Sequence, residues 1–157
     1  MKKILSLLAA VTLLSTAASA KAEGLFNANE LGLMAYGTYA DRQEDSWGGG
    51  IGLSYFVTSH IGLGATTHWE NLSGSFIDNA AGEAYFRLPI GEFPIAPYAI
   101  GSAGYNWDFD GWLFGVGGGA EGRLNETVGI FGDAQYVFKE GGEKDGILLR
   151  LGFRFNM

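Results

Sequence analysis

Cysteine is absent from this 157-residue sequence, and proline and histidine are rare, with three and two residues respectively. Without cysteine the chain can form neither a disulfide framework nor a thiolate-based active site. The two histidines, His60 and His68, are too few on their own for a zinc site, which takes three or four protein ligands. We therefore expect no metal or other cofactor, and a fold that is held together by other means.

Basic residues are scarce as well: ten Lys and Arg stand against 17 Asp and Glu, which gives a formal net charge of −7. Proteins that bind nucleic acid present a basic surface, so nucleic acid is not an expected partner. Beyond the first twenty residues, no apolar run approaches the roughly 18 residues that a membrane-spanning helix requires. Helices are therefore not expected to span a membrane.

The first twenty residues have the three parts of a secretory signal peptide. Lys2 and Lys3 precede an apolar stretch over residues 4–14, and Ala18-Ser19-Ala20 stands before Lys21 as a cleavage site. We expect cleavage after Ala20, so residues 1–20 form a signal peptide and residues 21–157 form one exported domain.

The dominant feature of the remaining chain is an alternation of apolar residues with polar residues or glycine. The alternation recurs in eight segments of about ten residues, which is typical of β-strands. The segments cover approximately residues 30–40, 47–57, 60–70, 80–90, 95–107, 111–123, 127–139 and 146–157. The last segment, which ends in "LRLGFRFNM", keeps the alternation up to Met157, although chain ends usually fray. A barrel that closes by pairing the last strand with the first would satisfy the backbone groups of this terminal strand.

The connections between the segments alternate in character. Tight connections at 58–59, 91–94 and 124–127 alternate with polar ones at 41–46, 71–79, 108–111 and 139–145. In an up-and-down meander the polar connections all lie at one end of the sheet, and the tight turns lie at the other. The four tryptophans then share the end with the polar connections: Trp47, Trp69, Trp107 and Trp112. Buried core tryptophans have no reason to segregate in this way, whereas an aromatic girdle at a membrane interface does.

The second face of the segments carries charges of both signs. We expect an interior polar cluster made of His68, Glu83, Arg87, Glu121, Asp133, Arg150 and Arg154. An eight-stranded barrel has an interior that side chains only just fill, so these groups must neutralise one another. A hairpin through 139–145 places Asp133 opposite Arg150 or Arg154, where an ion pair is expected, and a hairpin through 71–79 places Glu83 nearly opposite His68. The interior is thus predicted to be packed and polar, without a continuous pore.

The signal peptide, the eight segments, "PYAIGSAGYNWD" (97–108), "FGVGGGAEGRLNETVGIFGDAQY" (114–136) and the terminal alternation together resemble the small eight-stranded outer-membrane barrels, grouped with opacity-protein and OmpA-like surface antigens. The resemblance implies an all-β fold, an eight-stranded antiparallel up-and-down transmembrane β-barrel in a Gram-negative outer membrane. It also implies that the outer-membrane assembly machinery reads the last strand, through Phe153, Phe155 and Met157. The family usually ends in an aromatic residue, and this chain departs from that pattern by ending in Met157.

Two motifs have alternative interpretations. Residues 117–122, "GGGAEG", match the dinucleotide-binding pattern G-x-G-x-x-G, but that pattern needs a helix to begin on the glycines. Here the glycines fall inside an alternating segment, where we expect small residues to leave room for facing side chains. A histidine and a carboxylate near the outer rim, His68 and Glu83, resemble part of the serine-histidine site of the lipid A deacylases. However, no serine lies two residues away on the same face.

Taken together, the sequence predicts a monomeric outer-membrane barrel with a structural or surface-interaction role and no catalytic site. Its expected partners are outer-membrane lipid and, during biogenesis, the assembly machinery. Two alternatives stay open at this point: a lipid A-modifying outer-membrane enzyme, and a lipocalin-like envelope barrel that binds a ligand. The location of all four tryptophans at one end argues against the lipocalin-like alternative, because buried core tryptophans have no reason to segregate in this way.

Overall fold

The computed structural model describes residues 25–41, 46–69, 79–107, 110–140 and 145–157. Each of the eight expected segments is a strand. They are β1 (Glu30–Asp41), β2 (Ser46–Phe56), β3 (Ile61–Trp69), β4 (Asn79–Arg87), β5 (Ile95–Asn106), β6 (Gly111–Arg123), β7 (Val128–Lys139) and β8 (Gly146–Asn156). The expected signal peptide and most residues of the four polar connections lie outside the described residues. No helix in the described ranges is long and apolar enough to cross a membrane.

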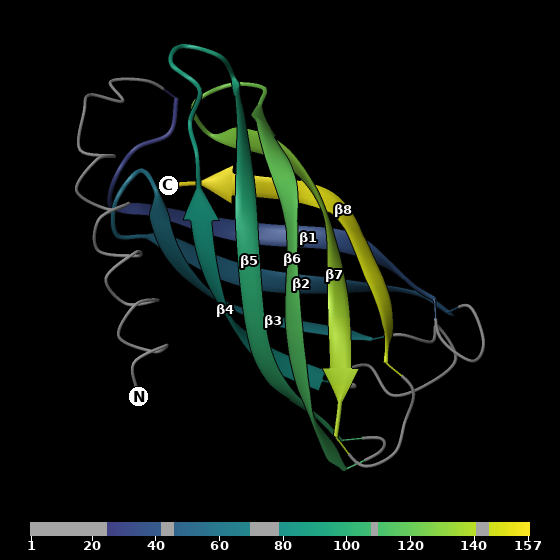
Figure 1. The fold of residues 1–157 in the computed structure, drawn as a ribbon. Helices are drawn as coiled ribbons and strands as arrows, with labels where there is room; N and C mark the ends of the chain where they lie inside the picture. The colour runs from purple at the N-terminus through teal and green to yellow at the C-terminus, as the bar shows by residue number, and fades with distance from the viewer. Residues whose placement is uncertain (1–24, 42–45, 70–78, 108–109, 141–144) are drawn as a thin grey trace, which may run out of the picture.

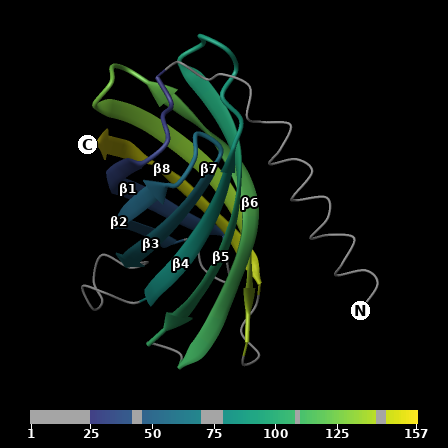
Figure 2. The ribbon, with the colours of Figure 1, turned by 90° about the vertical axis from the view of Figure 1, so that its left-hand side faces the viewer.

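The strands form one closed antiparallel barrel in which each strand pairs with its neighbours in sequence and β8 pairs with β1. Figures 1 and 2 show the eight strands running obliquely around the barrel. The β1–β8 pairing extends from Gly32↔Asn156 to Asp41↔Ile147. Beyond it, the backbone N–H of Met157 donates to the carbonyl of Leu31 at 2.8 Å. The alternation up to the last residue is therefore the pattern of the strand that closes the barrel.

The strand ends agree with the expected ones to within about three residues, and the largest difference is at the end of β4. This strand stops at Arg87 instead of near residue 90. Pro89 cannot donate to a strand ladder, and Gly91 adopts a left-handed φ of 53° that turns the chain back. Leu88 still donates its N–H to the carbonyl of Pro97 at 2.8 Å, so the hairpin continues for one bond beyond the strand.

The inside and outside of the barrel are reversed relative to a water-soluble protein. In β8 every second residue is buried, from Gly146 to Asn156, and those between are exposed. Arg154 has no exposed surface, whereas Leu151 is 67% exposed. Large apolar side chains cover the outside of the other strands as well, among them Leu33, Ile51, Leu53, Leu63, Phe114, Val116 and Phe138.

Two glycines of β6, Gly117 and Gly119, are required by the neighbouring strand rather than by side chains across the lumen. A Cβ atom added at Gly117 would overlap the carbonyl oxygen of Ala134 in β7, and one added at Gly119 would overlap that of Gly132. The expectation that glycine leaves room for a facing side chain fits other positions. A Cβ at Gly115 of β6 would overlap the hydroxyl of Ser102, and one at Gly62 would lie 2.7 Å from the ring of Phe56. At Gly117 and Gly119 the absence of a Cβ therefore lets the backbones of β6 and β7 approach closely.

We predict that Gly119→Ala destabilises the barrel by about 1–3 kcal/mol, because the added methyl group must displace the β7 backbone. Gly101→Ala is the matched control, since a Cβ there would be 4.0 Å from its nearest neighbour, the carbonyl of Gly115. The measurement is the urea unfolding midpoint of the refolded protein in lipid vesicles. Equal midpoints for the two variants would contradict this account of the glycine run.

Candidate functional site

The charged side chains of the lumen form two clusters at different heights. The turn-end cluster, near the tight turns, consists of Glu30, Arg87, Glu121, Arg123 and Arg154. The mid-barrel cluster consists of Glu83, Asp133 and Arg150. All eight residues are at most 8% exposed, although they come from five different strands. Such burial is tolerable only if each charge has a partner.

The turn-end cluster is a continuous network of ion pairs. Glu121 of β6 lies at its centre and pairs with Arg87 (3.7 Å), with Arg123 (2.8 Å) and with Arg154 of β8. Glu30 of β1 pairs with Arg87 at 3.3 Å and also with Arg123. Two carboxylates thus hold three guanidinium groups, and they connect β1, β4, β6 and β8 across the lumen.

Aromatic rings cover this network on the turn side. Phe26, which precedes β1, is 2% exposed, and its ring faces the guanidinium groups of Arg87 at 4.8 Å and Arg123 at 4.9 Å. Arg87 also lies over the ring of Phe56 at 3.7 Å, and its Nη2 donates to the carbonyl of Asn27 at 3.4 Å. Cation–π contacts of this kind stabilise guanidinium groups that are removed from water. The segment before β1 therefore packs onto the turn end of the lumen.

His60 lies in the tight turn beside this cluster. Its carbonyl accepts the backbone N–H of Arg87 at 2.7 Å, and its Nδ1 lies 2.8 Å from the hydroxyl of Ser59. Partial burial, and next the positive charge of Arg87, lower the pKa of His60 below its ordinary value. The imidazole is therefore neutral at pH 7 and adds no charge to the turn end.

In the mid-barrel cluster one arginine serves two carboxylates. Arg150 binds Asp133 through two hydrogen bonds, from Nε at 2.9 Å and from Nη2 at 3.0 Å, and it binds Glu83 through Nη1 at 2.6 Å. Each carboxylate also accepts a hydrogen bond from a tyrosine hydroxyl: Tyr98 donates to Asp133 at 2.7 Å, and Tyr85 donates to Glu83. The register Asp133↔Arg150 confirms the ion pair expected in the last hairpin. The second carboxylate, Glu83, was not expected there.

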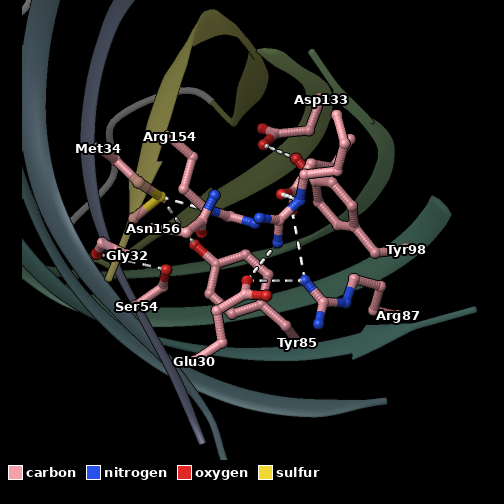
Figure 3. A network of polar contacts seen from close by, with 12 residues as sticks. Glu30, Gly32, Met34, Ser54, Tyr85, Arg87, Tyr98, Asp133, Arg154 and Asn156 are labelled. Atoms are coloured by element: carbon pink, nitrogen blue, oxygen red, sulfur yellow. Dashed lines mark hydrogen bonds and ion pairs between the residues drawn. The ribbon is translucent and has the colours of Figure 1, made fainter. Parts of the chain in front are cut away.

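The two clusters meet at Met34, as the close-up in Figure 3 shows. Arg154 of the turn-end cluster donates to Met34 Sδ at 3.3 Å, and the Tyr85 hydroxyl lies 3.9 Å from the same sulfur. The turn-end cluster has three Arg and two carboxylates, whereas the mid-barrel cluster has one Arg and two carboxylates. The excess charges are therefore +1 and −1, and they cancel over the whole network.

The structure buries all seven residues of the expected interior cluster, with His68 at 6% exposed. It does not bring His68 opposite Glu83, and that expectation was wrong. In the β3–β4 register His68 pairs with Asn79, and Glu83 pairs with Gly64. A register shift of four residues keeps every side chain on its own face, so the alternation cannot distinguish the two pairings.

Three residues of the network were missed in the sequence. The alternation of β1 and β6 could have identified Glu30 and Arg123 as inward-facing. Glu30 precedes the outward-facing Leu31, and Arg123 lies two residues after the inward-facing Glu121. No sequence pattern indicated Phe26, since it precedes the first strand and follows no strand periodicity.

The four tryptophans lie at the strand ends near the polar connections, and three of them, Trp47, Trp107 and Trp112, are more than half exposed. Phe153, Phe155 and Met157 are exposed on the outside at the opposite end.

We predict that Arg150→Met costs about 3–5 kcal/mol or more of unfolding free energy, because it leaves two buried carboxylates without their cation. Asp133→Asn should cost less, since Arg150 keeps Glu83 as a partner. The triple variant Glu83→Gln, Asp133→Asn, Arg150→Met should recover much of the loss. Urea unfolding in lipid vesicles measures all three, with Glu92→Gln in the exposed β4–β5 turn as the neutral control. An Arg150→Met midpoint equal to that of the wild type would show that the carboxylates are solvated.

Comparison with known proteins places this geometry in a family. The chain is similar in fold to the N-terminal β-barrel domain of Pseudomonas aeruginosa OprF, with 20% identity, a TM-score of 0.61, and coverage of 83% of this chain and 99% of that one. It is also similar to Neisserial surface protein A, with 13% identity, a TM-score of 0.56, and coverage of 82% and 96%. OprG from Pseudomonas aeruginosa gives 11% identity, a TM-score of 0.56, and coverage of 83% and 97%. No curated protein matches the sequence.

At these identities the solved structures establish the fold alone. The family itself follows from the sequence, since the model of the outer membrane protein beta-barrel domain matches residues 6–155. This match covers nearly all of the chain, including the strands that carry both charged clusters. The chain belongs to the family of outer-membrane β-barrel domain proteins.

Proposed function

We propose that the protein is a monomeric structural or surface-interaction barrel of the Gram-negative outer membrane, without pore or enzyme activity. The observation that carries the proposal is the combination of an apolar outside with a charge-balanced, packed inside. The outside of the barrel suits lipid as a partner. The inside is occupied by side chains that bind one another, which leaves the connections beyond the strand ends as the parts that face other molecules.

The aromatic residues support a membrane setting. Trp47, Trp107 and Trp112 are exposed at one end, and the ring of Tyr39 lies 4.9 Å from that of Trp47. Amphipathic rings of this kind favour the boundary between lipid and water. In this proposal Trp69 joins them as an outer girdle, and the polar connections face the cell exterior. A signal peptide cleaved after Ala20 would direct the chain to export.

Phe153, Phe155 and Met157 are proposed as the signal that the assembly machinery reads. They lie on the outward face of the strand that closes the barrel, and the backbone of this strand can pair with another protein until closure brings β8 beside β1. Surface display is supported by one structural relative, whose name describes it as a surface protein.

The bonding of Glu83 argues against the hydrolase alternative. A carboxylate that orients a catalytic histidine must be free to accept from its ring N–H. Glu83 instead accepts hydrogen bonds from Thr66 at 3.0 Å, from Arg150 at 2.6 Å and from Tyr85, and it lies four residues away from the β4 position that pairs with His68.

We predict that the purified protein inserts into lipid vesicles as a folded monomer and does not increase their permeability to small solutes. Insertion is checked by a gel-mobility difference between boiled and unboiled samples, and permeability is checked by conductance across planar bilayers. The same bilayers with an open porin provide the positive control. Steady single-channel conductance from the folded monomer would contradict the packed-lumen proposal. Recovery of a folded monomer from the periplasm without detergent would contradict the membrane assignment.

A further inference from the structure

A small cavity lies inside the barrel between the mid-barrel cluster and the end with the polar connections. Its volume is about 20 Å³. Glu83 and Arg150 line it on one side, and Leu113, Val137 and Leu148 line it on the other. These three residues form a buried apolar cluster with Ala40. The cavity thus lies between charged side chains and aliphatic side chains.

Asn79 contributes an unsatisfied amide to the wall of this cavity. The residue is 1% exposed, and neither Oδ1 nor Nδ2 of its side chain has a hydrogen-bond partner among the described residues. Its backbone carbonyl is satisfied, because it accepts the hydroxyl of Thr67 at 2.7 Å. A buried amide without partners costs free energy, and native structures usually satisfy such groups with protein or with ordered water.

The other polar groups around the cavity are already engaged. The hydroxyl of Ser102 donates to Gln135 Oε1 at 3.0 Å, and Gln135 Nε2 donates to Asp133 at 3.3 Å. Both carboxylate oxygens of Glu83 accept hydrogen bonds. A metal cation would need several free oxygen ligands, which this wall lacks. The groups that can bind a ligand here include the donor and the acceptor of the Asn79 amide and the remaining lone pairs of Ser102 and Gln135. The ring of His68 also lines the cavity.

We propose that this cavity is a binding site for an ordered water molecule held by Asn79. A volume of about 20 Å³ accommodates one water, which requires 10–15 Å³ and two to four polar partners. The water accepts from Asn79 Nδ2 or donates to Oδ1, and it reaches Ser102 or Gln135 on the neighbouring wall. It thereby connects β4 with β5 or β7, beside the ion pair of Glu83 and Arg150. This inference does not depend on the proposed cellular role.

A crystal structure at about 1.8 Å or better tests the site directly. We expect one density peak within 2.7–3.2 Å of an Asn79 side-chain atom, the range for such hydrogen bonds. An empty cavity, or an Asn79 amide bonded directly to protein, would overturn the proposal. Crystals soaked in rubidium chloride distinguish water from a cation, because an anomalous peak in the cavity would assign it to an alkali metal instead.

NMR of the protein in detergent micelles tests the site in solution. In the wild type we expect a cross-peak between water and the Asn79 side-chain NH₂ that indicates a bound water. Asn79→Leu should remove water contacts from neighbouring groups such as the Gln135 amide, whereas Ser54→Ala, a buried change near the turn end, should keep them. Folding of each variant is checked by the gel-mobility difference between boiled and unboiled samples. Absence of the cross-peak in the folded wild type, or its survival at Gln135 in folded Asn79→Leu, would contradict the proposal.

Discussion

The structure depends on the neutralisation of charge inside a lumen that is filled by side chains. Eight formally charged residues from five strands are buried there, four of each sign. Each would be costly alone, and the network gives every one of them an opposite charge within 4 Å. Because all but one of these ion pairs join different strands, the whole network forms only when the barrel has closed in the correct register. Neutralisation of the buried charges therefore depends on correct closure of the barrel.

Aromatic and sulfur-containing side chains make this network compatible with a narrow barrel. The rings of Phe26 and Phe56 stack against guanidinium groups at the turn end. Met34, between the clusters, contacts both Arg154 and Tyr85. Glycines remove side-chain volume next to some of these groups, as at Gly62 beside the Phe56 ring. Polar, aromatic and small residues thus fill most of the lumen, whereas most of the large aliphatic residues lie on the outside.

Much of this arrangement could be predicted from the sequence because side chains alternate strictly along a strand. The alternation identified all eight strands and the inward face of Glu83, Asp133 and Arg150. The short connection after Lys139 also limited the register of the last hairpin to pairings that include Asp133 with Arg150. What failed was the pairing across the longer connection between β3 and β4. There, a shift by an even number of residues preserves every face, so His68 was assigned to Glu83 instead of Asn79.

The central claim is that the outward residues of each strand contact lipid while the inward residues contact only one another. Cross-peaks between lipid acyl chains and the protein, measured by NMR in nanodiscs, test this residue by residue. Along β8, we expect acyl-chain contacts at Leu149, Leu151 and Phe153, and none at Arg150 and Arg154. Acyl-chain contacts at the arginines, or contacts with water in place of lipid at the three apolar residues, would contradict the claim.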